Sequence, residues 1–156
     1  MFAPDTKILN ILILLNIGIL GVAYFIEYIL KIPPCSMCIY QRIPYYLAVT
    51  AILLSLFKIL NLKKLITVLL LLTVTNLGLS FYHIGIEQGF FEELSTCANN
   101  LKSNDINNLL NELKKQKIVS CKDISFTIFG FSLATINFAI SLGLMLLYSL
   151  ILKNEK

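Results

Sequence analysis

Four long apolar segments constrain the fold of this chain more than any other feature. They cover roughly residues 8–30, 43–62, 65–86 and 125–152. At about 1.5 Å per residue, the second segment spans about 30 Å as a helix, the thickness of a bilayer's hydrocarbon core. Because 57% of the residues are hydrophobic and only 14% are charged, polar side chains are too few to cover a soluble globule. The sequence predicts an all-α membrane protein, a four-transmembrane-helix bundle in which residues 1–156 form a single integral-membrane domain.

The lysines indicate how the bundle is oriented. They gather at the chain ends and in the short connection between the second and third segments, at Lys7, Lys58, Lys63, Lys64, Lys153 and Lys156. Short basic segments stay on the cytoplasmic side of a membrane, so both termini are expected there and the loops 31–42 and 87–124 on the opposite side. The net charge of +4 forms no basic stripe with interleaved aromatic residues, so nucleic-acid binding has no support.

All four cysteines lie in the two outer loops. Cys35 and Cys38 form a C-x-x-C motif in "KIPPCSMCIYQRIPYY", while Cys97 and Cys121 belong to the longer second loop. An even number of cysteines that all fall on one face indicates an oxidising or redox-active side of the membrane.

The second outer loop contains an amphipathic pattern. In "SNDINNLLNELKKQKI" the apolar positions follow helical spacing, at Ile106, Leu109, Leu110 and Leu113. We expect a short helix that either lies flat on the membrane surface or packs on its own loop. Both arrangements keep Cys97 and Cys121 close to the membrane.

The four cysteines could bind a metal or haem, form structural disulfides, or carry out thiol–disulfide exchange. A closed zinc site takes four ligands, usually from paired motifs, and this chain has one C-x-x-C and one histidine, so no metal is expected. Haem attachment needs a histidine after Cys38, where Ile39 stands. A structural Cys35–Cys38 bridge closes so short a ring that it stabilises little, although Cys97–Cys121 is a plausible staple. The combination favours thiol–disulfide exchange over two inert disulfides.

Exchange requires a thiolate, and two features near the motif favour one. Pro33 and Pro34 precede the cysteines, so these are expected at a helix N-terminus, which lowers thiol pKa. Arg42 follows Cys38 by one helical turn. Pro44 conflicts with a continuous helix: a kink keeps Arg42 beneath the cysteines, whereas a break makes "CSMCIYQR" a separate turn.

Two further side chains are candidates for binding a cofactor. Arg42 is either an interfacial anchor or the group that binds an electron-rich acceptor. His83, in "LSFYHIGIEQGF", lies near the outer end of the third segment, where an ionisable residue marks a functional site by default. Glu87, one turn later, is expected at the interface. The small residues Gly130, Ala134, Ser141 and Gly143 are expected to let the fourth helix approach its neighbours closely.

Three motifs resemble the DsbB family of inner-membrane disulfide-bond-formation proteins. They are "PCSMCIYQR" entering the second span, "FYHIGIEQG" closing the third and "FGFSLATIN" opening the fourth, and the resemblance covers nearly the whole chain. Family members carry Glu or Gln before the arginine, and this chain has Gln41.

The resemblance implies a multi-pass protein of a bacterial inner membrane with its cysteine loops in the periplasm. It implies an oxidase that reoxidises a periplasmic thioredoxin-like partner of the DsbA type and passes electrons to a quinone (ubiquinone or menaquinone). By the same resemblance, the reduced partner attacks Cys97, the released Cys121 attacks Cys35, and Cys38 faces the quinone. Arg42 polarises a quinone oxygen.

Two alternatives are compatible with the same features. Proteins similar to vitamin K epoxide reductase are also four-helix membrane redox units with a C-x-x-C, but they carry that motif after the loop cysteines, which is the reverse of the order here. A non-catalytic membrane scaffold with two structural disulfides is the alternative from a different class.

Overall fold

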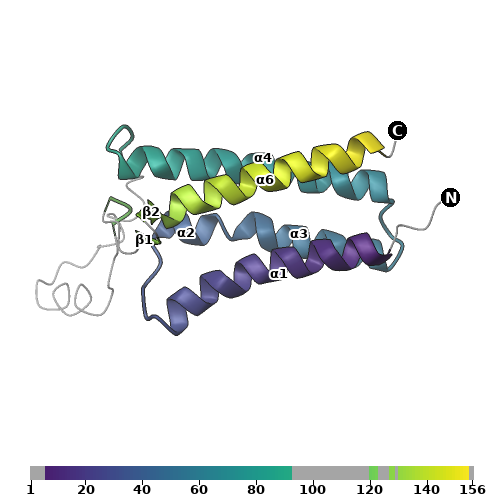
Figure 1. Ribbon diagram of the computed structural model, residues 1–156, viewed down its shortest axis with the longest axis horizontal. Coiled ribbons are helices and arrows are strands. Elements are labelled where there is room, and N and C mark those ends of the chain that lie inside the picture. Colours follow the sequence, from purple (N-terminus) through teal and green to yellow (C-terminus); the bar gives the residue numbers. More distant parts are fainter. Residues whose placement is uncertain (1–5, 93–119, 123–126, 129, 155–156) are drawn as a thin grey trace, which may run out of the picture.

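The computed structural model describes residues 6–92, 120–122, 127–128 and 130–154 (Figure 1). Its elements are α1 (Thr6–Tyr28), α2 (Ser36–Tyr40), α3 (Ile43–Leu56), α4 (Leu62–Glu87), β1 (Thr127–Ile128), β2 (Phe131–Ser132) and α6 (Leu133–Asn154). Four stretches are long and apolar enough to cross a membrane: Lys7–Tyr28, Ser36–Leu56, Leu62–Glu87 and Leu133–Lys153. The predicted all-α four-helix membrane bundle is confirmed. The amphipathic helix expected within residues 104–118 lies outside the described residues.

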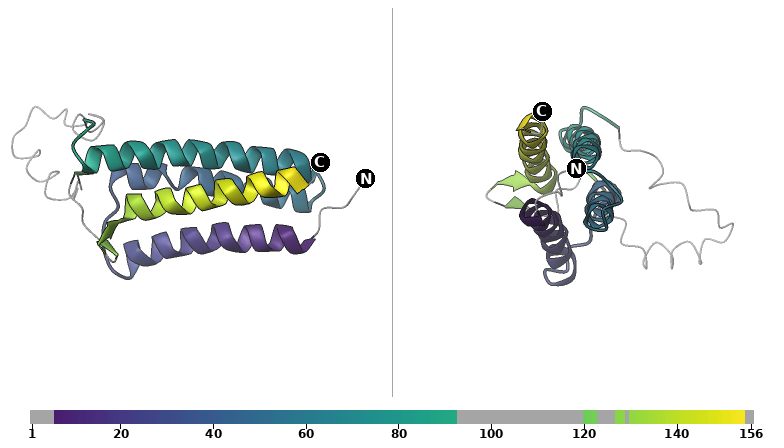
Figure 2. Two further views of the ribbon diagram at one scale, coloured as in Figure 1. Left: turned by 45° about the horizontal axis from the view of Figure 1, so that its top comes forward. Right: turned by 90° about the vertical axis from the view of Figure 1, so that its right-hand side faces the viewer.

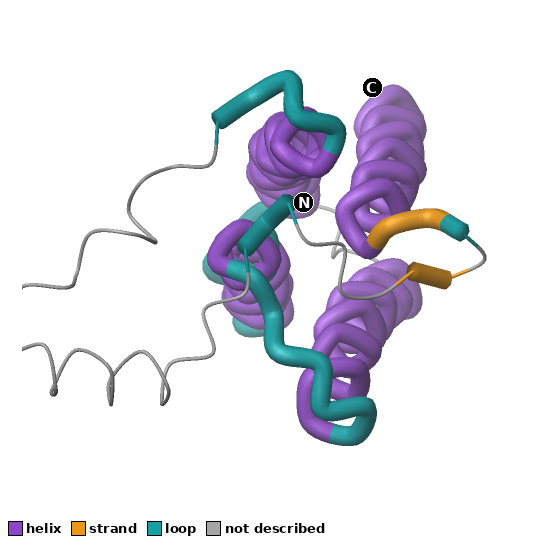
Figure 3. The backbone as a smooth tube through the Cα atoms, turned by 90° about the vertical axis from the view of Figure 1, so that its left-hand side faces the viewer, coloured by secondary structure: helices purple, strands orange, loops and turns teal. Residues whose placement is uncertain are grey.

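The four long helices run side by side, and the start of α1 and the end of α6 lie at the same end of the bundle (Figures 1 and 2). The short helix α2 and the β1–β2 hairpin lie at the opposite end, which faces the viewer in Figure 3. The connection that carries Cys35 and the residues around Cys121 belong to this end, so we call it the cysteine end. The C-x-x-C therefore lies one bundle length away from the start of α1 and the end of α6.

The interior is apolar with hydrogen bonds between polar side chains of different helices, and the exterior carries many large apolar side chains. Leu12, Ile52 and Leu69 are among the core residues with almost no exposed surface. Asn16 Nδ2 donates to the Tyr148 hydroxyl at 3.3 Å, which ties α1 to α6. On the outside, large side chains such as Leu14 and Phe81 are more than half exposed. In a bilayer this surface meets lipid. The hydrophobic effect does not drive helices together among lipid tails, so the buried hydrogen bonds between helices contribute to holding the bundle together.

The second span breaks near the cysteine end. Helix α2 ends at Tyr40, Gln41 and Arg42 form a turn, and α3 begins at Ile43 with Pro44 in its first turn. Proline is tolerated there because its missing N–H has no intrahelical partner in any case. Gln41 and Arg42 keep right-handed helical backbone angles, so the second span is interrupted between α2 and α3 but not ended there, and part of the predicted outer loop 31–42 is helical.

The same span ends earlier than the expected residue 62. Lys58 has a positive φ of 60°, and Ile59 N–H donates to the Leu54 carbonyl. This six-residue closure is the Schellman pattern, in which a left-handed residue ends the helix and satisfies its last carbonyls. Glycine usually takes that position, so a lysine there left no signal in the sequence.

The fourth span begins later than the expected residue 125. The β1–β2 hairpin pairs Thr127 with Ser132, and Gly130 turns the chain with a φ of 83°. Ser132 then caps α6, because its hydroxyl accepts a hydrogen bond from Thr135 N–H at 3.2 Å. Helix α6 starts where the cap is, although the apolar run continues upstream of it.

Candidate functional site

The C-x-x-C motif occupies the first turn of α2. Cys35 is the N-cap residue in an extended conformation, and its Sγ accepts a hydrogen bond from Cys38 N–H at 3.4 Å. The Cys35 thiol donates to Cys38 Sγ, and the two sulfurs lie 3.1 Å apart. Pro33 and Pro34 hold the approach to this turn extended, as their restricted φ angles require. The expected location at a helix N-terminus is what the structure shows.

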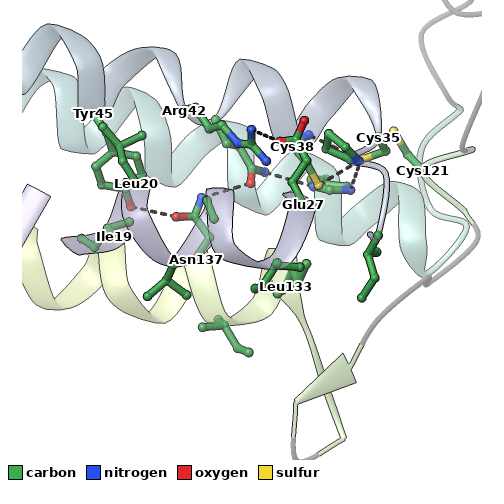
Figure 4. Close-up of a pocket in the computed structure, with 18 of the residues that line it drawn as sticks. Ile19, Leu20, Glu27, Cys35, Cys38, Arg42, Tyr45, Cys121, Leu133 and Asn137 are labelled. Atoms are coloured by element: carbon green, nitrogen blue, oxygen red, sulfur yellow. Dashed lines mark hydrogen bonds and ion pairs between the residues drawn. The ribbon is translucent and has the colours of Figure 1, made fainter. Parts of the chain in front are cut away.

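Cys121 lies against this pair although it is more than 80 positions away in the chain. It is buried, with 3% of its surface exposed, and it packs in one cluster with Cys35, Met37 and Ile86. Figure 4 shows Cys121 beside Cys35 at the cysteine end. A cysteine of the second loop therefore reaches the C-x-x-C, as thiol–disulfide exchange between the loops requires. Cys97 lies outside the described residues.

The environment of Cys35 opposes ionisation. Its hydrogen bond to Cys38 and its burial raise the pKa of the Cys35 thiol to about 12, and a hydrogen bond from His83 opposes this rise. The expectation that the helix N-terminus lowers the pKa of this cysteine is wrong. The reason is that Cys35 is the donor to its neighbour's sulfur, so the pair favours the state in which Cys35 keeps its proton.

His83 connects the cysteines to the rest of the bundle. The ring is almost fully buried on α4, with Nε2 3.5 Å from Cys35 Sγ and 3.8 Å from Glu87 Oε1. On its other side, Nδ1 lies 3.1 Å from Gln41 Nε2. Glu87 is held in turn by the Ser132 hydroxyl, which donates to Oε2 at 2.6 Å. Glu87, expected at the interface, instead has only 8% of its side chain exposed and belongs to the site.

Arg42 lines the same cavity as Cys35 and Cys38, and its guanidinium contacts two residues of α1. Its Nη1 lies 2.5 Å from Glu27 Oε2, and its guanidinium carbon lies 5.0 Å from the centre of the Tyr24 ring. The Arg42 side chain is 13% exposed, so it does not extend into water as an interfacial anchor would.

A cavity of about 170 Å³ lies between these groups. One water needs about 10–15 Å³ on this scale, so the space suits a larger molecule. Its wall combines the apolar side of α1 with polar groups from α2, α4 and α6, among them Cys38, Arg42, His83 and Asn137 (Figure 4). The α1 residues in the wall are Ile19, Leu20, Val22, Ala23, Ile26 and Glu27. An apolar wall with a few convergent polar groups is the usual form of a small-molecule site.

Three potential metal ligands also gather here. One ligand atom from each of Cys35, Cys38 and His83 lies within 4.8 Å of the others. A closed structural zinc site has four protein ligands, and the part of the chain that the structure describes brings only these three together.

Sequence reasoning missed two residues of the site. Asn137 on α6 bonds Gln41, Ser80 and Tyr45, and Glu27 on α1 pairs with Arg42. Each is a polar residue within or at the end of an apolar span, where polar groups are costly and therefore functional candidates. That signal was present for both, but it did not indicate their partners.

Comparison with known proteins agrees with this arrangement. The family model described as "Disulfide bond formation protein DsbB" matches residues 5–151. A protein of Rickettsia prowazekii (strain Madrid E), named "Uncharacterized protein RP370", is 31% identical over 151 residues, which is 94% of this chain and 87% of that protein. No solved structure matches the chain.

Proposed function

Because the chain belongs to the DsbB family of disulfide bond formation proteins, we propose that it is a membrane thiol:quinone oxidoreductase. It oxidises a thioredoxin-like partner of the DsbA type and passes the electrons to ubiquinone or menaquinone. The observation that carries the proposal is the contact of Cys121 with the Cys35–Cys38 pair beside a partly apolar cavity. The whole chain acts as one domain of a bacterial inner membrane, with the cysteine end in the periplasm and both termini in the cytoplasm.

Electrons enter at the second loop. The reduced partner attacks Cys97, and the Cys121 thiolate released by this step attacks Cys35, which is its neighbour in the structure. A Cys35–Cys121 disulfide forms, the Cys35–Cys38 bond breaks, and its electron pair remains on Cys38. When the partner's second thiol displaces Cys97, that thiolate attacks Cys121 and frees Cys35. Each step exchanges one disulfide for another, and the net result is that the partner's two thiols become a disulfide while the Cys35–Cys38 disulfide becomes two thiols, which hold the two electrons for the quinone.

The residues around the cavity fit a quinone. Lipid-soluble molecules enter from the bilayer, and the α1 side of the cavity is apolar. Arg42 would hold a quinone oxygen as a charged donor, and His83 stands beside the sulfurs as a second polar group. A bound quinone supplies the acceptor for two electrons and two protons, which balances the conversion of two partner thiols to one disulfide. The chain supplies position and electrostatics.

An anaerobic assay tests this function. Purified, oxidised protein is mixed with a reduced thioredoxin-like periplasmic partner and a soluble quinone, and quinone absorbance is followed. One quinol per partner disulfide is expected, and none from Cys97→Ala or Cys38→Ala variants. No quinol with the unaltered protein, while partner thiols are shown to be free, would overturn the proposal in favour of a stapled scaffold.

A further inference from the structure

Four polar side chains, three from α3, α4 and α6 and one from the turn before α3, form a continuous chain of hydrogen bonds that ends at the cysteines. The Tyr45 hydroxyl donates to Asn137 Oδ1 at 2.7 Å, and Asn137 Nδ2 donates to Gln41 Oε1 at 3.0 Å. Gln41 Nε2 then faces His83 Nδ1 at 3.1 Å, and His83 Nε2 faces Cys35 Sγ at 3.5 Å. Figure 4 shows the dashed lines running from Tyr45 through Asn137 toward Cys35. The thiol–disulfide exchange and the quinone contacts proposed above assign no role to Tyr45, Asn137 or Gln41.

The direction of this chain follows from a backbone carbonyl. Gln41 Nε2 lies 3.5 Å from the Leu79 carbonyl oxygen. A carbonyl only accepts hydrogen bonds, so the amide nitrogen of Gln41, and not its oxygen, must face that side. The same nitrogen faces His83 Nδ1, which therefore accepts. The Gln41 oxygen is left for Asn137 Nδ2, in agreement with Tyr45 as the donor at the far end.

A neutral imidazole has one donor nitrogen and one acceptor nitrogen, so accepting at Nδ1 places the proton on Nε2. The surroundings of Nε2 agree independently, because both groups that face it, Cys35 Sγ and Glu87 Oε1, can accept. The titratable groups around the ring are Cys35 and Cys38 beside α2 and Glu87 on its own helix, whereas α6 contributes the neutral Asn137 through Gln41. A proton on Nε2 also occupies the position that a metal ion would need.

We propose that Tyr45, Asn137 and Gln41 are positioning residues that fix His83 as the Nε2–H tautomer, so that its ring donates a hydrogen bond to Cys35 Sγ. This role rests on the proposed function, in which the Cys121–Cys35 disulfide breaks as Cys97 attacks Cys121. The Cys97–Cys121 bond forms, and the electron pair of the broken bond remains on Cys35 Sγ. The Nε2–H group stabilises that charge, which makes Cys35 a better leaving group.

The tautomer can be measured directly because His83 is the single histidine of the chain. Full-length protein labelled with ¹⁵N-histidine, and purified without a histidine tag, yields one pair of ring nitrogen signals. We expect a protonated Nε2 and a bare Nδ1. In Gln41→Glu the carboxylate only accepts, so the neutral ring is expected to move its proton to Nδ1. A protonated Nδ1 in the unaltered protein, or an unchanged ring in Gln41→Glu, would overturn the assignment.

The effect on Cys35 is measured without quinone. The protein carrying the Cys121–Cys35 disulfide is prepared, and release of Cys35 is followed by acid quench and alkylation. Gln41→Met keeps the size of the side chain but removes its donor, and we expect it to slow release by about 10- to 100-fold, the equivalent of one hydrogen bond to a charged sulfur. His83→Ala is expected to slow it at least as much.

The pH profile separates positioning from simple structural support. In Gln41→Glu a neutral ring holds its proton on Nδ1 and donates nothing to Cys35, so the rate of Cys35 release, divided by that of the unaltered protein at the same pH, is expected to fall as pH rises. In the unaltered protein the neutral ring keeps its donor, so this loss is absent. A purely structural role for Gln41 predicts parallel profiles.

Thr73→Val is the matched control. Thr73 is buried on the same helix as His83, and its hydroxyl donates to the Leu69 carbonyl, apart from the chain of hydrogen bonds. It is expected to leave tautomer and release rate unchanged. Release in Gln41→Met as fast as in Thr73→Val would overturn the role of the chain. Quinol formation enters none of these measurements, so a failure of the oxidase function appears in the anaerobic assay and leaves the tautomer result standing.

Discussion

Replacing Arg42 by Gln tests the electrostatics of the cavity. Arg42 lines the cavity together with Cys38, and its guanidinium already contacts Glu27 and the Tyr24 ring. The side chain is held in place before any ligand arrives, so its loss should weaken quinone binding without disturbing the sulfurs. We therefore expect Arg42→Gln to raise the apparent KM for quinone and to leave thiol exchange with the partner nearly unchanged.

The size of the effect follows from the contacts. A hydrogen bond to a charged group contributes about 1.5–3 kcal/mol, and about 1.4 kcal/mol is a factor of ten, so KM should rise by about 10- to 100-fold. Stability also falls, because the Glu27 carboxylate loses its partner. That side chain is 23% exposed and regains some water, so the cost lies below the roughly 3–5 kcal/mol that breaking a fully buried pair requires.

A double variant separates the two effects. Arg42→Gln with Glu27→Gln removes both charges, so no unpaired carboxylate remains and most of the stability should return. KM should stay high, because the donor for the quinone is still missing. Glu27→Gln alone leaves Arg42 without a competing carboxylate and is expected to lower KM.

Initial rates of quinone reduction at several quinone concentrations give KM, and rapid quench with the partner gives the exchange rate. An unchanged KM in Arg42→Gln would refute the reasoning and leave Arg42 as a partner of Glu27 alone. A normal KM in the double variant would show that Arg42 serves only to neutralise Glu27.

Three other changes test separate parts of the structure. In a protein whose two second-loop cysteines are replaced, Cys38→Ala should lower the pKa of Cys35, because the hydrogen bond to Cys38 is the largest cause of its rise. Alkylation of Cys35 should then begin at lower pH, and an unchanged pH profile of alkylation would contradict this. Gly85→Ala places a methyl group in the space that the Phe91 ring occupies, so the ring must move, and detergent unfolding should show a loss of stability on the order of 1 kcal/mol. Ser132→Ala removes the α6 cap and should cost about 1 kcal/mol, with hydrogen exchange accelerated first at the start of that helix.

The sequence alone predicted the elements that depend on local chemistry. Hydropathy over 20 residues is a property of each segment by itself, so the four spans needed no tertiary information. Pro44 and the C-x-x-C spacing likewise act within one turn of chain, so an interruption of the second span before α3 was foreseen. The end of α3 was placed too late, because Lys58 takes the left-handed position that ends the helix, and a lysine there gives no local signal in the sequence.

Which face each helix presents was decided only by packing. Ala134 and Ser141 are buried as expected, but Gly143 is exposed and Gly130 lies in a turn, and an added methyl group at either glycine meets nothing within 4 Å. Small residues are common on both faces of a membrane helix, so composition alone does not show which of them meet a neighbour.

In the candidate site, too, some features followed from local sequence and others only from tertiary packing. The sequence by itself determined that a C-x-x-C, an arginine and a histidine lie near one end of a membrane bundle, because each lies at the edge of an apolar run. Only the tertiary structure decided that Cys121 packs on Cys35, that Arg42 pairs with Glu27, and that Asn137 links Gln41 to Tyr45. These contacts join residues far apart in the chain, and they depend on how each helix is rotated about its axis. That rotation is set by all the neighbouring helices together, so no single segment of sequence contains it.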